Sequence, residues 1–267
     1  MLQAATYEAR KKFNGNAPIG VLIDTCVLEL AVTHETVWLQ YPDYGAAKRV
    51  PVYTANNRSE RHRQSSYLTV LRHLAQIGQL QFWSSRSLEA ERKLNPPGMV
   101  KGYGMFDRSL FDGMEIPNID GRLPLVWGPE RLGVPSLEEQ WRSELVGDPN
   151  EPTFAALWAL MRPTVGPKGN QDVWHLSTAE RHGLDYFLTT DQRFLKAVSQ
   201  LHHKEPLKSM HAKAVSPEGL GKILKLRPVA PIAFSYEDTN VFVSTEVVMP
   251  NEERRRRPKT SAARPPK

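Results

Sequence analysis

Four acidic side chains in this sequence have the residue types and positions needed to bind a divalent metal ion: Asp24, Glu91, Asp172 and Asp191. Hard oxygen ligands of this kind select Mg²⁺ or Mn²⁺ over softer metals. Such an ion can ionise a water molecule and stabilise the entering and leaving oxygens of a phosphodiester. Four carboxylates brought together repel one another strongly unless a cation is bound. If the fold gathers them, these residues predict metal-assisted hydrolysis.

The elements that must position these acids are short apolar strands, predicted at about 19–23, 80–83, 185–189 and 211–215. Asp24 ends the first of these runs, and Asp191 follows the third. Asp172 begins the helix that precedes the third run, and Glu91 lies about two turns into the helix after the second. Strands alternating with helices predict an α/β fold with a parallel sheet covered on both faces. Strand ends in such a sheet meet along one edge, where ligands bind.

Helices are predicted from apolar residues at helical spacing and from capping residues. A helix through about residue 94 has Ser84 or Ser85 as its N-cap candidate, and Asp24 or Thr25 could cap the helix after the first strand. Gly183 has the position of a glycine that ends a helix. The other predicted helices are at about 65–79, 136–146, 153–162 with a break at 163–169, 172–182, 191–198 and 217–224.

Three segments resemble those of PIN-domain nucleases. VLIDTCVLEL has an Asp at the end of the first strand, followed by a hydroxyl residue. SSRSLEAERKL is similar to the family's second acidic segment, where a Glu follows a small residue by about six positions; counting from Ser85 gives Glu91, with Glu89 as the close alternative. QDVWHLSTAERHGLDYFLTTDQRFL has the family's Asp, helix, Gly and strand ending in Thr-x-Asp, with a spacing of nineteen between Asp172 and Asp191. AVSPEGLGKIL is also similar to its last strand and helix.

This resemblance implies a PIN-like three-layer α/β/α domain with a central parallel sheet over residues 1–226. It is interrupted by long insertions at about 33–64 and 96–168. Residues 227–250 would form a C-terminal extension with added strands in the alternating run at 240–247, and 251–267 a disordered basic tail. The implied activity is that of a Mg²⁺- or Mn²⁺-dependent endoribonuclease with all four acids as catalytic, metal-binding residues. RNA as the substrate comes only from the resemblance.

Several residues near the four acids in the sequence allow two interpretations. The hydroxyls of Thr25, Thr189 and Thr190 could bind a metal-bound water or a phosphate, or could be satisfied by backbone groups. Cys26 is expected to pack behind Asp24 without acting as a nucleophile. His175, one turn after Asp172, is expected to be a surface or packing residue. Core positions are expected for Trp127, Trp141 and Trp158.

The basic residues cluster in two places. Arg58, Arg61 and Arg63 predict either a solvated helix face or a contact with a nucleic-acid backbone. Residues 252–267 contain seven Lys or Arg and two Glu, so they account for +5 of the net charge of +6. This tail is either solvated or a phosphate-attracting arm. Its candidate contacts are Arg254, Arg255, Arg256 and Arg257.

Composition limits the other function classes. No run of eighteen apolar residues occurs, so a membrane partner is not expected. A single cysteine excludes an internal disulfide, and no secretory signal is recognisable, so we expect a cytoplasmic protein, or a nuclear one in a eukaryote because of RRRRPK. Two alternatives stay open: a PIN-like module that binds nucleic acid or protein without cutting, and a toxin neutralised by an antitoxin partner. The sequence does not predict the oligomeric state.

Overall fold

The computed structural model describes residues 1–13, 17–40, 47–53, 59–94, 108–128, 133–145 and 148–231. Its centre is a sheet of four parallel strands in the order β4-β1-β6-β7. The strands are β1 Ile19–Ile23, β4 Leu80–Trp83, β6 Tyr186–Leu188 and β7 Lys213–Val215. Val21 in the middle of β1 pairs with Phe82 on one side and Tyr186 on the other. Because all four strands run the same way, their carboxyl ends lie along one edge of the sheet.

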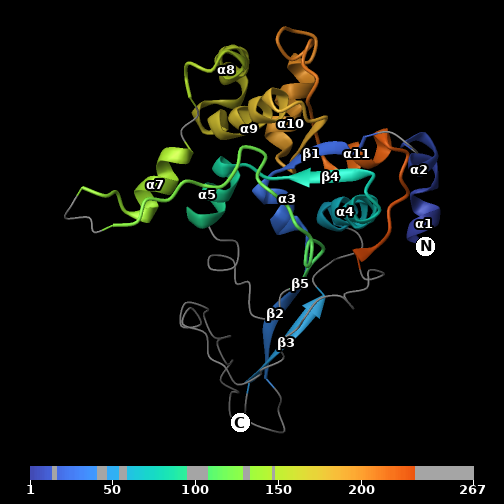
Figure 1. Ribbon diagram of the computed structural model, residues 1–267. Coiled ribbons are helices and arrows are strands. Elements are labelled where there is room, and N and C mark those ends of the chain that lie inside the picture. Colours follow the sequence, from blue (N-terminus) through green and yellow to red (C-terminus); the bar gives the residue numbers. More distant parts are fainter. Residues whose placement is uncertain are drawn as a thin grey trace, which may run out of the picture.

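Helices cover both faces of this sheet (Figure 1). Ile19, Val21 and Ile23 of β1 point into one hydrophobic cluster, and Leu22 points into the other, as alternation along a strand requires. The first cluster contains residues of α1 Leu2–Ala5, α2 Tyr7–Phe13, α3 Thr25–Leu30, α4 Glu60–Gln76 and α11 Pro217–Ile223. The second contains residues of α5 Arg86–Leu94, α8 Pro152–Val165, α9 Asn170–Arg181 and α10 Gln192–Leu201. The arrangement is a mixed α/β fold and is compatible with three α/β/α layers.

Segment 108–128 crosses the outer edge of the sheet beside β4. Ser84 at the end of β4 forms an isolated parallel bridge with Asn118, and its N–H donates to Pro117 O at 2.8 Å. The carboxylate of Asp120 accepts from Arg86 N at 2.8 Å, at the first residue of α5. Helix α7, Leu137–Glu144, packs beside α5, and the 3₁₀ turn η2, Pro167–Gly169, leads into α9. These contacts fix the start of α5, the helix that contains Glu91.

A second, antiparallel sheet extends away from the helical body (Figure 1). It consists of β2 Val32–Gln40, β3 Ala47–Tyr53 and the short β5 Arg108–Ser109, in the order β3-β2-β5. The sequence reading did not place this hairpin. Pro51 lies inside β3, opposite Thr36, and a proline within an apolar run argues against a strand in the sequence.

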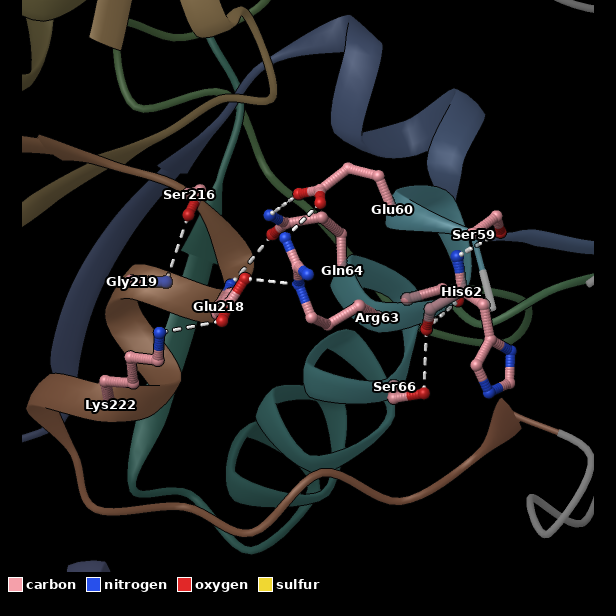
Figure 2. Close-up of polar contacts among 11 residues, drawn as sticks. Ser59, Glu60, His62, Arg63, Gln64, Ser66, Ser216, Glu218, Gly219 and Lys222 are labelled. Carbon is pink, nitrogen blue, oxygen red and sulfur yellow. Dashed lines mark hydrogen bonds and ion pairs between the residues drawn. The ribbon is translucent and has the colours of Figure 1, made fainter. Parts of the chain in front are cut away.

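Helices α4 and α11 are joined by a polar network (Figure 2). Arg63 donates to Glu218 at 2.7 Å and also pairs with Glu60. The backbone N–H of Glu218 donates to the side chain of Gln64 at 2.9 Å, and Lys222 pairs with Glu218 at 2.7 Å. These helices also approach closely. A Cβ at Gly221 would lie 2.1 Å from the Tyr67 ring, so a larger residue would force them apart.

The sequence predicted most of the central elements. The strands at 19–23 and 80–83 are confirmed with the same bounds, and the helix at 172–182 is α9, one or two residues earlier. The helix through residue 94 is also confirmed, with Ser85 accepting from Leu88 N at 3.3 Å as a cap. Gly183 has the positive φ expected of a helix-ending glycine, at 65°.

Two boundaries were wrong. The helix predicted at about 65–79 is α4, Glu60–Gln76, which begins earlier because Ser59 accepts from His62 N at 3.0 Å as the N-cap. Pro163 does not end α8, which continues to Val165. The helix ends at Gly166, where φ is 73°, because glycine tolerates this left-handed backbone.

Some predictions fall outside the described residues: the added strand at 240–247, the basic tail at 251–267, Arg58, and Arg254 to Arg257. Among the helices that are described, none is both long and apolar enough to cross a bilayer.

Candidate functional site

Asp24 lies at the carboxyl end of β1, where its N–H donates to Leu188 O of β6 at 3.0 Å. It occupies the N-cap position of α3, but its side chain makes no capping hydrogen bond. The carboxylate instead accepts from three side chains: Thr189 at 2.6 Å, Cys26 at 3.0 Å and Thr25 at 3.2 Å. Asp24 is only 5% exposed. A nearly buried carboxylate is therefore held by hydroxyl and thiol donors from two neighbouring strand ends.

Asp172 lies in the first turn of α9 and is electrostatically coupled to the other predicted acids. The pKa of its carboxyl is raised from 3.8 to about 7, first by burial and then by the negative charge of Asp24; Asp191 and Glu91 act in the same direction, and His175 opposes them. The interaction between two charges weakens with distance, so these charges act on Asp172 because they lie near it. The structure therefore brings the four sequence-predicted carboxylates into one neighbourhood.

Asp191 follows β6 at the same edge of the sheet. Its carboxylate accepts from Phe194 N at 2.9 Å and so caps α10, and its own N–H donates to Thr189 Oγ1 at 3.1 Å. Thr189 is fully buried and links Asp191 to Asp24. Its hydroxyl is thus used to orient a carboxylate, which neither reading of this residue from the sequence anticipated. Asp191 itself is exposed, at the outer side of the site.

Glu91 and Glu89 are separated by their directions on α5. Residues two apart point to well-separated sides of a helix. The side chain of Glu89 accepts from Asn118 of the crossing segment. Glu91 Oε2 lies 3.7 Å from His175 Nε2 of α9, and its charge acts on Asp172. Of the two candidates from the sequence, Glu91 is therefore the one that faces the other acids.

His175 is a buried residue, as one of the two sequence readings had it, but its contacts are with the acidic site. It is 2% exposed, and its Nδ1 lies 3.4 Å from Ser87 Oγ. Burial alone would lower the pKa of His175, but Glu91, and then Asp24 and Asp172, raise it above its usual value. The signal in the sequence was the spacing of three from Asp172, which puts both residues on one face of α9.

Cys26 behaves as the sequence predicted. Burial raises the pKa of its thiol to about 12, with Asp24 as the next cause. The thiol stays protonated, so it serves as a donor to Asp24 and not as a nucleophile. Its sulfur accepts from Thr190 N at 3.2 Å, which is the contact through which Thr190 adjoins the site.

The donor set fits a hard divalent cation, since it consists of carboxylate oxygens, and the pKa of Asp172 is raised by burial and then by the negative charge of Asp24. Within the residues that the structure describes, no three His, Cys, Asp or Glu side chains already stand in metal-ligating geometry. Asp24 is turned toward Thr189 and Cys26, and Asp191 toward the first turn of α10.

The arginines predicted to contact nucleic acid bind groups of the protein itself, where the structure describes them. Arg63 binds Glu60 and Glu218, and Arg61 donates to Glu29 O at 3.2 Å. Nearer the acids, exposed Arg193 reaches over the turn before α9: a Cβ at Gly166 would lie 3.4 Å from its Nη2. The sequence reading missed Arg193, although it stands two positions after Asp191.

The exposure of the three tryptophans differs from the prediction that they lie in the core. Trp127 is 76% exposed, which contradicts its expected core position. Its segment is fixed by Gln140, which binds both the N–H and the carbonyl of Val126, so the side chain is free to project outward. Trp158 stacks on Phe154 with ring centroids 6.5 Å apart and is partly buried, as is Trp141.

A separate open cleft of about 490 Å³ lies between α5, α7 and α9. Its lining includes Arg86, Trp174, Arg181 and His182 together with Asp120 and Glu144, and none of the four site acids. Asp148 is a third acid in this lining, so with His182 neutral the acids exceed the arginines by one.

Comparison of the chain with protein families, with curated proteins and with solved structures finds no match.

Proposed function

We propose that this protein is a metal-dependent nuclease with a PIN-like fold, an endoribonuclease that hydrolyses phosphodiester bonds. The observation that carries the proposal is the coupling of Asp24, Glu91, Asp172 and Asp191, which come from separate elements and act together on the pKa of Asp172. Their order along the chain and their strand-end positions are the ones that resemble the PIN family. Titratable groups with strongly shifted pKa values that share one neighbourhood favour a functional site over a structural one.

Mg²⁺ or Mn²⁺ would be held by these four carboxylates. When bound, the ion supplies an activated water and stabilises the charge that develops on the phosphodiester. The chain's own contribution is positioning. Thr189, Cys26 and Thr25 orient Asp24, and the coupling between Asp172 and its neighbours creates the negative potential that attracts a cation.

Substrate binding needs cations at the rim of this acidic site, because a polyanion is repelled by the carboxylates themselves. Arg193 is in the right place, since it is exposed, follows Asp191 by two residues and makes no ion pair with any described residue. A guanidinium here could contact a backbone phosphate while the adjacent acids face the scissile bond.

The test uses the purified full chain with single-stranded RNA, and with DNA in parallel, in Mn²⁺, in Mg²⁺ and in EDTA. We expect cleavage only with metal, and its loss in Asp24→Asn. Asp148→Asn is the matched control, since Asp148 is exposed and lies in the separate cleft. No cleavage of either nucleic acid with any metal would overturn the proposal. Metal-independent binding without cleavage would favour the binding-module alternative instead.

A further inference from the structure

The imidazole of His175 is fixed from one side by a chain of hydroxyl groups. Its Nδ1 lies 3.4 Å from Ser87 Oγ, and that hydroxyl lies 3.0 Å from Ser85 Oγ. Ser85 in turn accepts from Leu88 N at the start of α5. With the side chain almost fully buried, the ring has one orientation that keeps these contacts. The α5 N-terminus therefore determines where the other ring nitrogen points.

That other nitrogen, Nε2, is buried and has no hydrogen-bond partner among the residues that the structure describes. A buried polar group without a partner is unfavourable, so its persistence needs an explanation. Nε2 points toward Glu91, whose Oε2 is 3.7 Å away, which is within ion-pair range and slightly too long for a hydrogen bond. If Ser87 donates to Nδ1, Nε2 carries the proton and presents a donor to Glu91.

Glu91 is the acid that most needs such a partner. Asp24 is held by Thr189, and Asp191 by the first turn of α10. Glu91 has a longer side chain with more rotatable bonds, and His175 is its one polar side-chain contact within the described residues. Without that contact its carboxylate would sample several rotamers, with a loss of entropy whenever it joined the site.

We propose that His175 is a positioning residue, which holds the carboxylate of Glu91 toward Asp24 and Asp172 by presenting Nε2–H to it. This inference rests on the proposed function, because it assigns the residue that orients one of the four proposed metal ligands. Groups that orient metal ligands typically change metal affinity or activity by about 10- to 100-fold when they are removed.

Two substitutions of His175 distinguish the roles of its two ring nitrogens. His175→Gln can place an amide N–H near the position of Nε2, whereas His175→Asn can place its amide near the position of Nδ1. A purely structural role through Ser87 would be preserved better by Asn. A positioning role through Glu91 would be preserved better by Gln. His182→Asn is the control, since this histidine is exposed at the other end of α9.

The first measurement is Mn²⁺ affinity by calorimetry, together with kcat and KM for RNA cleavage. We expect His175→Asn to weaken Mn²⁺ binding and lower kcat by about 10- to 100-fold, with KM unchanged. His175→Gln should recover most of this loss. In a Glu91→Gln background the difference between Asn and Gln should vanish. Equal effects of Asn and Gln in folded proteins would overturn the proposal.

A second measurement does not depend on activity. The ¹⁵N resonances of the His175 ring report which nitrogen carries the proton and what it contacts. Glu91→Gln should shift the Nε2 resonance, whereas Glu89→Gln, two residues away and bonded to Asn118, should leave it in place. An unshifted Nε2 in Glu91→Gln would also overturn the proposal. A wild-type protein that neither binds Mn²⁺ nor cuts RNA would overturn the proposed function, while the resonances would still decide the His175–Glu91 contact.

Discussion

Asp172→Asn should stabilise the metal-free protein while removing its response to metal. Burial and the charges of Asp24, Asp191 and Glu91 disfavour the ionised form of Asp172, and the charge of His175 offsets only part of this effect. An asparagine has a similar shape and cannot ionise. It therefore removes the electrostatic cost of this carboxylate from the folded state, together with one proposed ligand.

The direction in which the free energy of unfolding changes with pH follows from proton binding. Asp172 has a pKa of about 7 when folded and near 3.8 when unfolded, so between these pH values the folded state binds more protons. The free energy of unfolding then falls as the pH rises from about 4 to about 7, and the full penalty is present above that range. The difference between the two pKa values corresponds to about 4 kcal/mol.

The assay is thermal and urea unfolding in EDTA at pH values from 4 to 8. Asp172→Asn should match the wild type near pH 4 and exceed it increasingly toward pH 8. For a chain of this size each kcal/mol shifts Tm by about 2–4 °C, so the Tm difference at pH 8 approaches about 8–16 °C. Asp148→Asn, at an exposed position, should show no such trend.

Added Mn²⁺ should reverse the order of the two Tm values, so that the wild type becomes more stable than Asp172→Asn. The cation favours ionised Asp172, so it should stabilise the wild type strongly and the variant weakly. If the two proteins keep a constant Tm difference from pH 4 to pH 8 in EDTA, the carboxylates are not coupled as described, and the main support for the proposed function is lost.

Three further outcomes are expected. Gly221→Ala should lower the free energy of unfolding by about 1–3 kcal/mol in urea titrations, because the new Cβ meets the Tyr67 ring; unchanged stability would contradict the close contact of α4 and α11. Cys26 should react slowly with iodoacetamide at pH 8, since its pKa is about 12, and Asp24→Asn should speed this reaction in mass-spectrometric assays; equal rates would argue against their coupling. Arg193→Ala should raise KM for RNA and leave kcat unchanged, and the salt dependence of RNA binding should fall by about one released ion. An unchanged KM would contradict a contact between Arg193 and the substrate.

The sequence predicted what depends on local pattern. Short apolar runs followed by Asp24 and Asp191 indicated parallel strands, because strands covered on both faces need no polar alternation. Helix boundaries near Gly183 and Ser85 also follow from local chemistry: a left-handed backbone at the first, and a side-chain cap at the second. These signals require no knowledge of what packs against the element.

The features that the sequence did not predict depend on contacts between residues far apart in the chain. Glu91 and Glu89 are equivalent in a local reading, and they become distinct only because Asn118 binds one and His175 approaches the other. Trp127 was expected in the core, but it is exposed, and Gln140 binds the backbone of its neighbour Val126. Such contacts are properties of the assembled fold, so spacing alone could not reveal them.

The way Asp24 is held separates a ligand from a structural acid. Glu218, a structural carboxylate, is neutralised by Arg63 and Lys222, so it has no need of another cation. Asp24 is held by a hydroxyl and a thiol, which orient a carboxylate without cancelling its charge. Among the described residues, the site acids form no ion pair with Lys or Arg, and after burial it is the negative charge of Asp24 that most raises the pKa of Asp172. A group of carboxylates that is partly buried, oriented, and paired with no Lys or Arg among the described residues is costly to maintain, and a divalent cation is the partner that relieves the cost.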